Sequence, residues 1–281
     1  MKFQITHQTQ YTFSKPVFLE PHTLRFYPSN LQLSSVLNFN LQVYPQPSGI
    51  LFQTDCENNP IHFCWFEGTT SQLKVTATIL VENKNFSPFN FIFYPARFSS
   101  SPFSYSEEQQ QLLQIYLFYE DLSKSLTDYG KKLLQENNFE TIPFLLSLTR
   151  QINHDFTIEA RETGPPMSAN ETFQMKRGSC RDLAWMQIQL LRQMGMAAKF
   201  CSGYYYIDME QPEYELHAWV EVYLPGAGWF GLDPTAGLVT GENYVKVAAC
   251  AHFSNTNPLQ GNFRGDALAS LHTQLKIEVI L

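Results

Sequence analysis

The sequence predicts an α+β fold in which a β-sandwich-like N-terminal domain precedes a domain of helices followed by strands. Over the first hundred residues apolar and polar side chains alternate, as in residues 37–43 and 73–79, which is typical of β-strands. From residue 107 onward, apolar residues recur at helical spacing. The chain has 281 residues, of which 44% are hydrophobic and 16% charged, so it can bury the cores of two modest domains. We therefore expect one domain over residues 1–100 and another over residues 101–281.

The strands of the first domain are separated by turn-forming segments rich in Pro, Asn, Ser and Gly. These segments cover residues 27–30, 45–49 and 57–60. Several short strands at this spacing are typical of a β-sandwich. The Ser- and Pro-rich segment 98–104 ends the strand pattern, and we interpret it as a linker between the two domains.

The second domain is predicted to begin with helices and to end with strands. The helices cover residues 107–113, 122–134, 142–152 and 180–194, with a loop over 160–169. Thr141 suits an N-cap, Pro143 an early helical position, and Gly195 the end of the last helix. The strands cover residues 199–206, 217–224, 229–232 and 275–281, and the turn at 225–228 makes a hairpin of the second and third.

Composition and cysteine usage argue against several classes of protein. The net charge is −7 and the isoelectric point is near 5.5, which does not favour a nucleic-acid partner. No run reaches the roughly 18 consecutive apolar residues of a membrane span, and residues 1–7 lack the apolar stretch of a secretory signal. Five cysteines do not form a disulfide framework in a chain of this length. We expect a cytoplasmic protein that binds neither nucleic acid nor membrane; its oligomeric state is left open.

Cys180 is the first candidate catalytic residue. It follows Gly178 and Ser179 and begins a predicted helix, so it lies beside the unpaired N–H groups and the positive end of the helix dipole. This position favours the nucleophilic thiolate, and the same N–H groups can face an oxyanion. A small core cysteine is the alternative interpretation.

His217 and Asp233 are the second and third candidates. His217 begins a strand and shares its face with Trp219, Glu221 and Tyr223, opposite the apolar face, so we expect it at an edge or cleft. Counting outward from the predicted turn places Asp233 near the same end of the hairpin. A carboxylate there can bind one imidazole nitrogen and leave the other for the thiol. The alternatives are a solvent-facing histidine and an Asp-Pro-Thr turn without a catalytic role.

The three candidates occur in the order of a helix-borne nucleophile followed by a hairpin with a base and a group that orients it. Cys180 precedes His217 by 37 residues, and His217 precedes Asp233 by 16. Their motifs are Gly-Ser-Cys-Arg-Asp-Leu-Ala at 178–184, His-Ala-Trp-Val-Glu-Val at 217–222 and Gly-Leu-Asp-Pro-Thr at 231–235. Together they resemble the core motifs of bacterial transglutaminase-like proteins. Further similarity covers residues 194–204 in the core, and residues 11–17 and 21–25 in a β-rich N-terminal domain that accompanies this core in bacteria.

This resemblance implies a papain-like transglutaminase core preceded by the β-sandwich-like domain. It also implies that Cys180 is the nucleophile, that His217 is the general base and acid, and that Asp233 orients His217. The sequence departs from the family pattern at residues 250–253, where Cys-Ala-His-Phe replaces an Arg-Asp pair, and in the turn Asp-Cys-Glu-Asn-Asn at residues 55–59. These departures bear on substrate preference and leave the three motifs intact.

No metal or cofactor is predicted. Cys56, His62 and Cys64 lack the fourth ligand of a structural zinc site, and the sequence contains no calcium loop or nucleotide-binding motif. Gln174, six residues before Cys180, is a candidate oxyanion donor, with an ordinary surface glutamine as the alternative.

The predicted reaction is attack by the Cys180 thiolate on a peptide or glutaminyl amide of a peptide or protein substrate, which gives a thioester. Water as the acceptor would make the protein an amide hydrolase, and an amine would make it an acyltransferase. The sequence leaves the acceptor open, although the small size favours hydrolysis. A catalytically idle scaffold or protein-binding module with the same fold is the alternative from another class.

Overall fold

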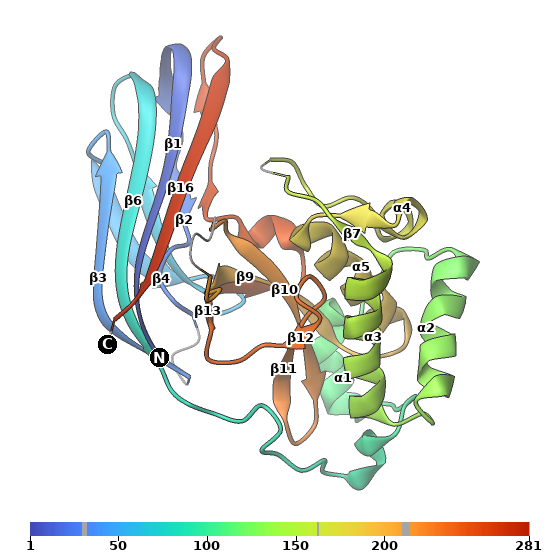
Figure 1. The fold of residues 1–281 in the computed structure, drawn as a ribbon. Helices are drawn as coiled ribbons and strands as arrows, with labels where there is room; N and C mark the ends of the chain where they lie inside the picture. The colour runs from blue at the N-terminus through green and yellow to red at the C-terminus, as the bar shows by residue number, and fades with distance from the viewer. Residues whose placement is uncertain (30–32, 162, 210–213, 281) are drawn as a thin grey trace.

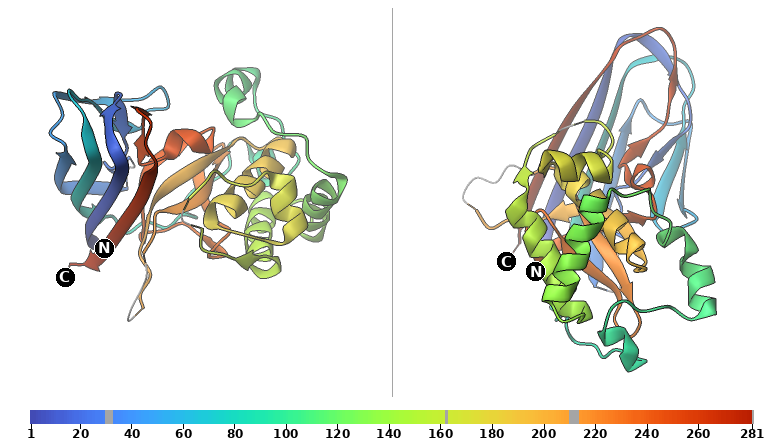
Figure 2. Two further views of the ribbon diagram at one scale, coloured as in Figure 1. Left: turned by 90° about the horizontal axis from the view of Figure 1, so that it is seen from above. Right: turned by 90° about the vertical axis from the view of Figure 1, so that its right-hand side faces the viewer.

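A computed structural model describes residues 1–29, 33–161, 163–209 and 214–280. A β-sandwich lies on one side of the molecule, the helices lie on the other, and a third sheet lies between them (Figure 1). The view from above shows the same order of layers (Figure 2). The predicted α+β fold, with a β-rich N-terminal part and a transglutaminase-like core, is confirmed.

The sandwich is built from two antiparallel sheets. The larger sheet contains β1 (Lys2–Leu19), β3 (Ser34–Tyr44), β6 (Thr70–Asn83), β15 (Phe263–Arg264) and β16 (Ala269–Val279). The smaller sheet contains β2 (His22–Leu24), β4 (Gly49–Thr54), β5 (Pro60–Trp65) and β14 (Leu259–Gln260). Alternation along β1 and β6 turns Phe3, Ile5, Val75 and Ile79 into the core of the sandwich, which is why these segments form strands with one buried face.

The third sheet has the order β12-β11-β10-β9-β13 and forms the centre of the second unit. Its strands are β9 (Ala198–Tyr205), β10 (His217–Leu224), β11 (Gly228–Asp233), β12 (Leu238–Val239) and β13 (Tyr244–Cys250). The helices are α1 (Glu107–Leu113), α2 (Lys124–Glu136), α3 (Thr141–Asp155), α4 (Ala169–Met175) and α5 (Cys180–Gln193). Three short 3₁₀ helices, η1 (Ala96–Ser99), η2 (Gln114–Tyr116) and η3 (Phe253–Thr256), and a parallel pair, β7 (Thr157–Ile158) with β8 (Arg177–Gly178), complete the fold.

Helix α5 is held against the third sheet by apolar contacts. Val220 and Val222 of β10 lie in one buried cluster with Leu183 and Ile188 of α5. The β10–β11 hairpin has the predicted turn, since Leu224 pairs with Gly228. The predicted end of α5 is also confirmed, because Gly195 adopts a positive φ of 81° just beyond it. The helix and the hairpin that carry the candidate residues are thus packed directly on one another.

The C-terminal strands lie in the sandwich and not in the third sheet. Strand β16 runs antiparallel to β1 from the pair Phe13 and Ala269 to the pair Phe3 and Val279, and the two strands lie side by side in both views (Figures 1 and 2). Strand β14 pairs with β2, and β15 with β1. Strands β14, β15 and β16 fall within the predicted second domain of residues 101–281. In the structure they belong to the sandwich of the first domain, because they pair with β1 and β2.

Segment 98–104 is a packed part of the structure and not an open linker. Phe98 and Tyr105 are buried in a small aromatic cluster against Ala197. Thr141 donates its hydroxyl hydrogen to the Phe98 carbonyl at 2.8 Å, and Ser101 donates its N–H to the Phe139 carbonyl at 2.7 Å. The prediction of a linker was wrong because its Ser and Pro residues fold around aromatic anchors. Thr141 is likewise not an N-cap, since Glu140 precedes the helix.

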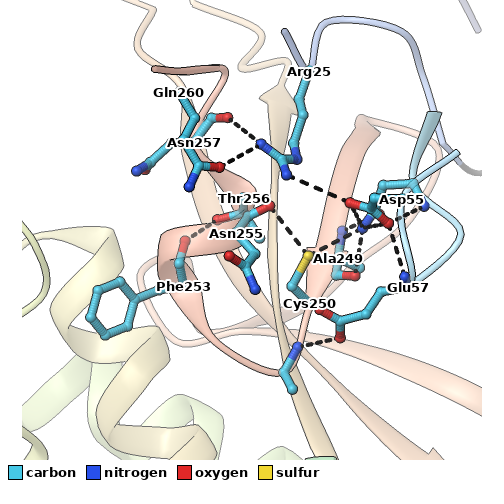
Figure 3. A network of polar contacts seen from close by, with 12 residues as sticks. Arg25, Asp55, Glu57, Ala249, Cys250, Phe253, Asn255, Thr256, Asn257 and Gln260 are labelled. Carbon is cyan, nitrogen blue, oxygen red and sulfur yellow. Dashed lines mark hydrogen bonds and ion pairs between the residues drawn. The ribbon is translucent and has the colours of Figure 1, made fainter. Parts of the chain in front are cut away.

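A partly buried polar network joins the sandwich to the end of β13 (Figure 3). Arg25 donates to Gln260 at 3.0 Å and lies 3.7 Å from the carboxylate of Asp55. Asn59 is buried; its Oδ1 accepts from the Ala249 N–H at 2.8 Å, and its Nδ2 donates to the Ala249 carbonyl at 3.2 Å. These bonds satisfy the backbone where β13 meets the sandwich, so they fix one unit on the other.

No helix in the described ranges is long and apolar enough to cross a lipid bilayer.

Candidate active site

Cys180 is the first residue of α5 and remains partly exposed. Ser179 precedes it as the N-cap, and the carbonyl of Ser179 accepts from the N–H groups of Asp182 and Leu183 at 3.0 and 3.1 Å. The N–H of Cys180 itself has no partner among the residues that the structure describes. A thiol at this place lies at the positive end of a buried helix, with a backbone donor beside it.

Asp182 fixes the start of this helix. Its fully buried carboxylate accepts from the N–H and the hydroxyl of Ser179, both at 2.7 Å. It also accepts from the N–H of Met167 at 2.7 Å and from Arg161 at 2.5 Å. A Cβ at position 178 would lie 2.7 Å from the Asp182 side chain, so the close approach requires Gly178. The Gly-Ser-Cys-Arg-Asp motif thus anchors the loop before α4 to the N-terminus of α5.

Arg181 places a positive charge beside the thiol. Its guanidinium donates to the Gly164 carbonyl at 2.8 Å and also to the carbonyl of Arg161, which ties the loop before α4 to the site. Burial lowers the pKa of Arg181, and the neighbouring Cys180 and Glu215 act in the opposite direction. Charges of both signs therefore lie near Cys180.

His217 and Asp233 meet across the β10–β11 hairpin. Nε2 of His217 lies 2.7 Å from Oδ2 of Asp233, and their side chains are 14% and 0% exposed. The carboxylate takes up one imidazole nitrogen and leaves Nδ1 for another partner, and Cys180 is close enough to raise the pKa of the ring. The three residues from the sequence motifs therefore lie close together, and His217 and Asp233 are directly hydrogen-bonded.

Both oxygens of the Asp233 carboxylate accept hydrogen bonds. Oδ1 accepts from the N–H groups of Thr235 and Ala236 at 2.8 and 3.2 Å, the pattern of an Asx turn. Oδ2 accepts from the hydroxyl of Tyr244 at 2.8 Å as well as from His217. Burial alone would raise the pKa of Asp233, but the charge of His217 and these hydrogen bonds outweigh it and lower that pKa.

The charge of Asp233 also raises the pKa of His217. Burial alone would lower the pKa of the imidazole, but the attraction and hydrogen bond of Asp233, together with the contact to Cys180, raise it to about 10. At neutral pH the ring is therefore an imidazolium beside the sulfur of Cys180. Such a pair can supply both a nucleophile and the proton for a leaving group.

The face of β10 that carries His217 is more buried than its polar residues predict. Trp219 and Glu221 are both buried, whereas the side chain of His217 keeps 14% of its surface exposed. Glu221 accepts from Lys246 at 2.7 Å and from Lys199 at 3.1 Å. Burial would raise the pKa of Glu221, but the two ammonium groups lower it to about 2. Glu221 can therefore be buried on this face because two lysines pair with it. The alternation of residue types along β10 does not reveal this burial.

Two aromatic residues of the site were missed by the sequence analysis. Tyr244 lies on β13, a strand that was not predicted, and its ring stacks on Tyr205 of β9 with centroids 4.4 Å apart. The ring of Tyr205 lies 5.3 Å from that of His217. The alternation Tyr-Val-Lys-Val at 244–247 was a signal for the strand, but nothing local in it points to Asp233.

The other candidates lie outside this arrangement. Gln174 is an exposed residue of α4. Cys56 lies exposed in a turn, whereas Cys64 is buried in the sandwich and His62 packs on Phe39 and Phe52. Across the described residues, no group of three or more His, Cys, Asp or Glu side chains is arranged to hold a metal ion.

Known families match both halves of the chain. Residues 3–82 match the bacterial transglutaminase-like N-terminal region, and residues 134–234 match the transglutaminase-like superfamily. The second range contains Cys180, His217 and Asp233. Both units of the fold are thus matched, and the match includes all three motifs.

Individual relatives resemble the chain over different lengths. An uncharacterized protein of Mycobacterium leprae is 22% identical over 290 residues, covering 98% of each chain. A protein-glutamine gamma-glutamyltransferase of Pseudomonas aeruginosa is 25% identical over 112 residues, which are 36% of this chain and 17% of that protein. The crystal structure of a "putative cysteine protease" from Cytophaga hutchinsonii superposes with a TM-score of 0.72 at 19% identity, covering 100% of this chain and 91% of that one. The last likeness shows the fold, and with the two family matches it leads to one conclusion: the chain belongs to the bacterial transglutaminase-like family.

Proposed function

We propose that the protein is a cysteine-nucleophile acyl-transfer enzyme that acts on peptide or glutaminyl amides through a thioester on Cys180. The observation that carries this proposal is the proximity of Cys180, His217 and Asp233: the carboxylate binds Nε2 of the imidazole at 2.7 Å, and Cys180 is near enough to raise the pKa of the ring. The name of the Pseudomonas relative, a protein-glutamine gamma-glutamyltransferase, supports glutaminyl amides as a substrate class.

The first step forms the thioester. The Cys180 thiolate attacks the amide carbon, and the oxyanion that develops is stabilised by N–H groups at the start of α5. The His217 imidazolium then gives its proton to the amide nitrogen, the C–N bond breaks, and ammonia or an amine leaves. Asp233 holds His217 in the orientation that this proton transfer needs.

The second step releases the acyl group. Neutral His217 takes a proton from water or from an amine, the oxygen or nitrogen attacks the thioester carbon, and the Cys180 thiolate leaves. Water gives a carboxylic acid and an amine gives a new amide. We favour water as the acceptor in this small chain.

The proposal is tested with a glutamine-containing peptide as the donor. We expect ammonia release, and an acyl adduct on Cys180 that intact-mass spectrometry detects after rapid acid quenching. A fluorescent primary amine is then added as a competing acceptor. The ratio of carboxylic acid to fluorescent amide in the product shows whether water or the amine is the preferred acceptor. Cys180→Ala should abolish the adduct and turnover, whereas His217→Ala should slow turnover by about 100-fold or more because it removes the proton donor and acceptor.

Asp233→Ala supplies the decisive comparison. Residues that act as one unit have non-additive effects, so the double variant His217→Ala/Asp233→Ala should be little slower than His217→Ala alone. Arg264→Ala, on an exposed strand of the sandwich, is the matched control and should retain turnover. Wild-type turnover in every single variant would show that the catalytic assignment is wrong, and no turnover or adduct on any amide donor would support an idle scaffold instead.

A further inference from the structure

Tyr244 contacts Asp233 in the candidate site, yet the proposed reaction assigns no role to Tyr244. Its hydroxyl donates to Oδ2 of Asp233 at 2.8 Å, and Nε2 of His217 lies 2.7 Å from this same oxygen. The other oxygen of Asp233 is occupied by the N–H groups of Thr235 and Ala236. A carboxylate offers about four lone-pair positions, so all of them are filled and the phenol takes one of the two on Oδ2.

The phenol and the imidazolium therefore share one oxygen. A donor on Oδ2 withdraws electron density from it and brings the positive end of the O–H dipole close to the N–H of His217. Both effects make Asp233 a weaker acceptor for the imidazolium than it would be with His217 as its only side-chain partner. A weaker acceptor leaves a more acidic imidazolium.

We propose that Tyr244 is a positioning residue that shares Oδ2 of Asp233, weakens the hold of the carboxylate on His217 and so keeps the imidazolium able to donate its proton. The inference rests on the proposed function, in which that proton goes to the leaving nitrogen. Without the phenol, the His217 imidazolium would keep its proton more tightly, and amides with strongly basic leaving groups would react more slowly.

The place of Tyr244 is fixed by both units of the molecule. Its ring stacks on Tyr205 at an interplanar angle of 15° and meets the edge of Trp219 at 5.4 Å. Its backbone carbonyl accepts from Nδ2 of Asn83 at 3.0 Å, a buried contact from β6 of the sandwich. The sandwich therefore reaches the site through the strand that carries Tyr244, which gives this N-terminal unit a part in setting the site.

Other ionisable groups surround the pair without occupying Oδ2. They are Cys180 from α5, which acts on His217, and Tyr205 from β9, which acts on Asp233. Within the described parts of the chain, Tyr244 and His217 are the side chains that hydrogen-bond to this oxygen. A change in the acidity of His217 after loss of one hydroxyl is therefore attributable to Tyr244.

The test is an NMR titration of the His217 ring in Tyr244→Phe, made in a Cys180→Ala background so that the measurement reports the ring alone. We expect the pKa of His217 to rise by about 0.5–1 unit, the size that one net hydrogen bond can account for. Tyr204→Phe is the matched control: its buried hydroxyl pairs with Nδ1 of His7 at 3.1 Å, so the same atom is lost away from Asp233. An unchanged or lowered pKa in Tyr244→Phe would overturn the proposal.

Kinetics provide the second measurement, with the Cys180 thiol intact. Tyr244→Phe should slow an alkyl amide about threefold or more and leave an activated anilide nearly unchanged, because only the basic leaving group needs the proton early. A structural defect would slow both substrates equally and would overturn the proposal. A wild-type protein without turnover would count against the proposed function, and the titration would still decide whether Tyr244 tunes His217.

Discussion

The five cysteines differ in how far burial suppresses their chemistry. Cys64, Cys201 and Cys250 are buried, and desolvation raises the pKa of each of their thiols, to about 11 for Cys64. Cys180 and Cys56 are accessible, but of these two only Cys180 begins a buried helix and contacts an imidazolium. Reactivity should therefore follow the local setting of each thiol and not exposure alone.

We expect Cys180 to be alkylated first when the protein is treated briefly with iodoacetamide near pH 6. Peptide mapping by mass spectrometry measures the rate at each cysteine. The substitution His217→Gln should slow labelling of Cys180 and leave that of Cys56 unchanged, because Cys180 lies beside the ring and Cys56 lies in a turn of the sandwich. Equal or faster labelling of Cys56 in the wild-type protein would contradict this assignment.

The paired imidazolium should also make stability depend on pH. The pKa of His217 in the folded protein is about 10, because Asp233 and Cys180 outweigh the effect of burial, whereas the ordinary value is 6.5. A raised folded-state pKa contributes stability that is fully present below about pH 6.5 and is lost as the pH rises through 10. Urea unfolding of wild type and His217→Gln should therefore show a difference in free energy that shrinks between these values. His272→Gln, an exposed histidine on β16, is the control, and a difference that grows with pH would contradict the pairing.

At the scale of single elements, the junction of β13 with the turn at residues 55–59 holds the site in place. Asn59 binds both backbone groups of Ala249, and the sulfur of Cys250 accepts from its Nδ2 at 3.1 Å. β13 carries Tyr244 at its other end, so the junction and the site share one strand. The departures from the family pattern at residues 55–59 and 250–253 thus meet in space, as two sides of one polar network (Figure 3).

Asn59→Ala should destabilise the protein by about 2–3 kcal/mol, because it leaves the buried N–H and carbonyl of Ala249 without these partners. Urea unfolding at neutral pH measures the loss. Asn90→Ala, at an exposed asparagine, is the control and should change the free energy of unfolding little. A loss no larger than that of the control would show that the network does not hold β13.

At the scale of the whole molecule, the chain leaves the sandwich, builds the second unit and returns to complete the first. The exposed connection is the segment 84–95, where Ile92 and Tyr94 are each 78% exposed, and not the packed segment 98–104. A hydrophobic cluster that includes Phe3 and Val75 of the sandwich together with Val245 of β13 continues across the boundary. The two units should therefore unfold together, although each has its own sheets.

A protease of broad specificity should make its first cut between residues 84 and 95. Because β14, β15 and β16 pair with β2 and β1, the two fragments should stay together in gel filtration under native conditions and separate only in denaturant. N-terminal sequencing of the fragments locates the cut. A first cut within 98–104, or separation of the fragments without denaturant, would contradict this account of the boundary.

Much of the site can be predicted because its signals are local. Helix α5 follows from apolar spacing with Ser179 before it and Gly195 after it, and the β10–β11 hairpin follows from two alternating runs around a short turn. A short turn fixes the register, which brings His217 and Asp233 to the same end of the hairpin. The sequence by itself therefore determined the elements that carry the three candidates. Their catalytic roles stay a prediction.

Only the tertiary structure decided which elements lie beside them. Alternation along a strand defines its two faces but does not identify its neighbour, so nothing in the pattern placed β16 on β1 or β13 next to β9. The contact of Tyr244 with Asp233 depends on that pairing, and so does the burial of Glu221 between two lysines. Hydrogen bonds between distant segments form when the whole chain packs, because backbone and charged groups that leave water must find partners wherever the fold supplies them.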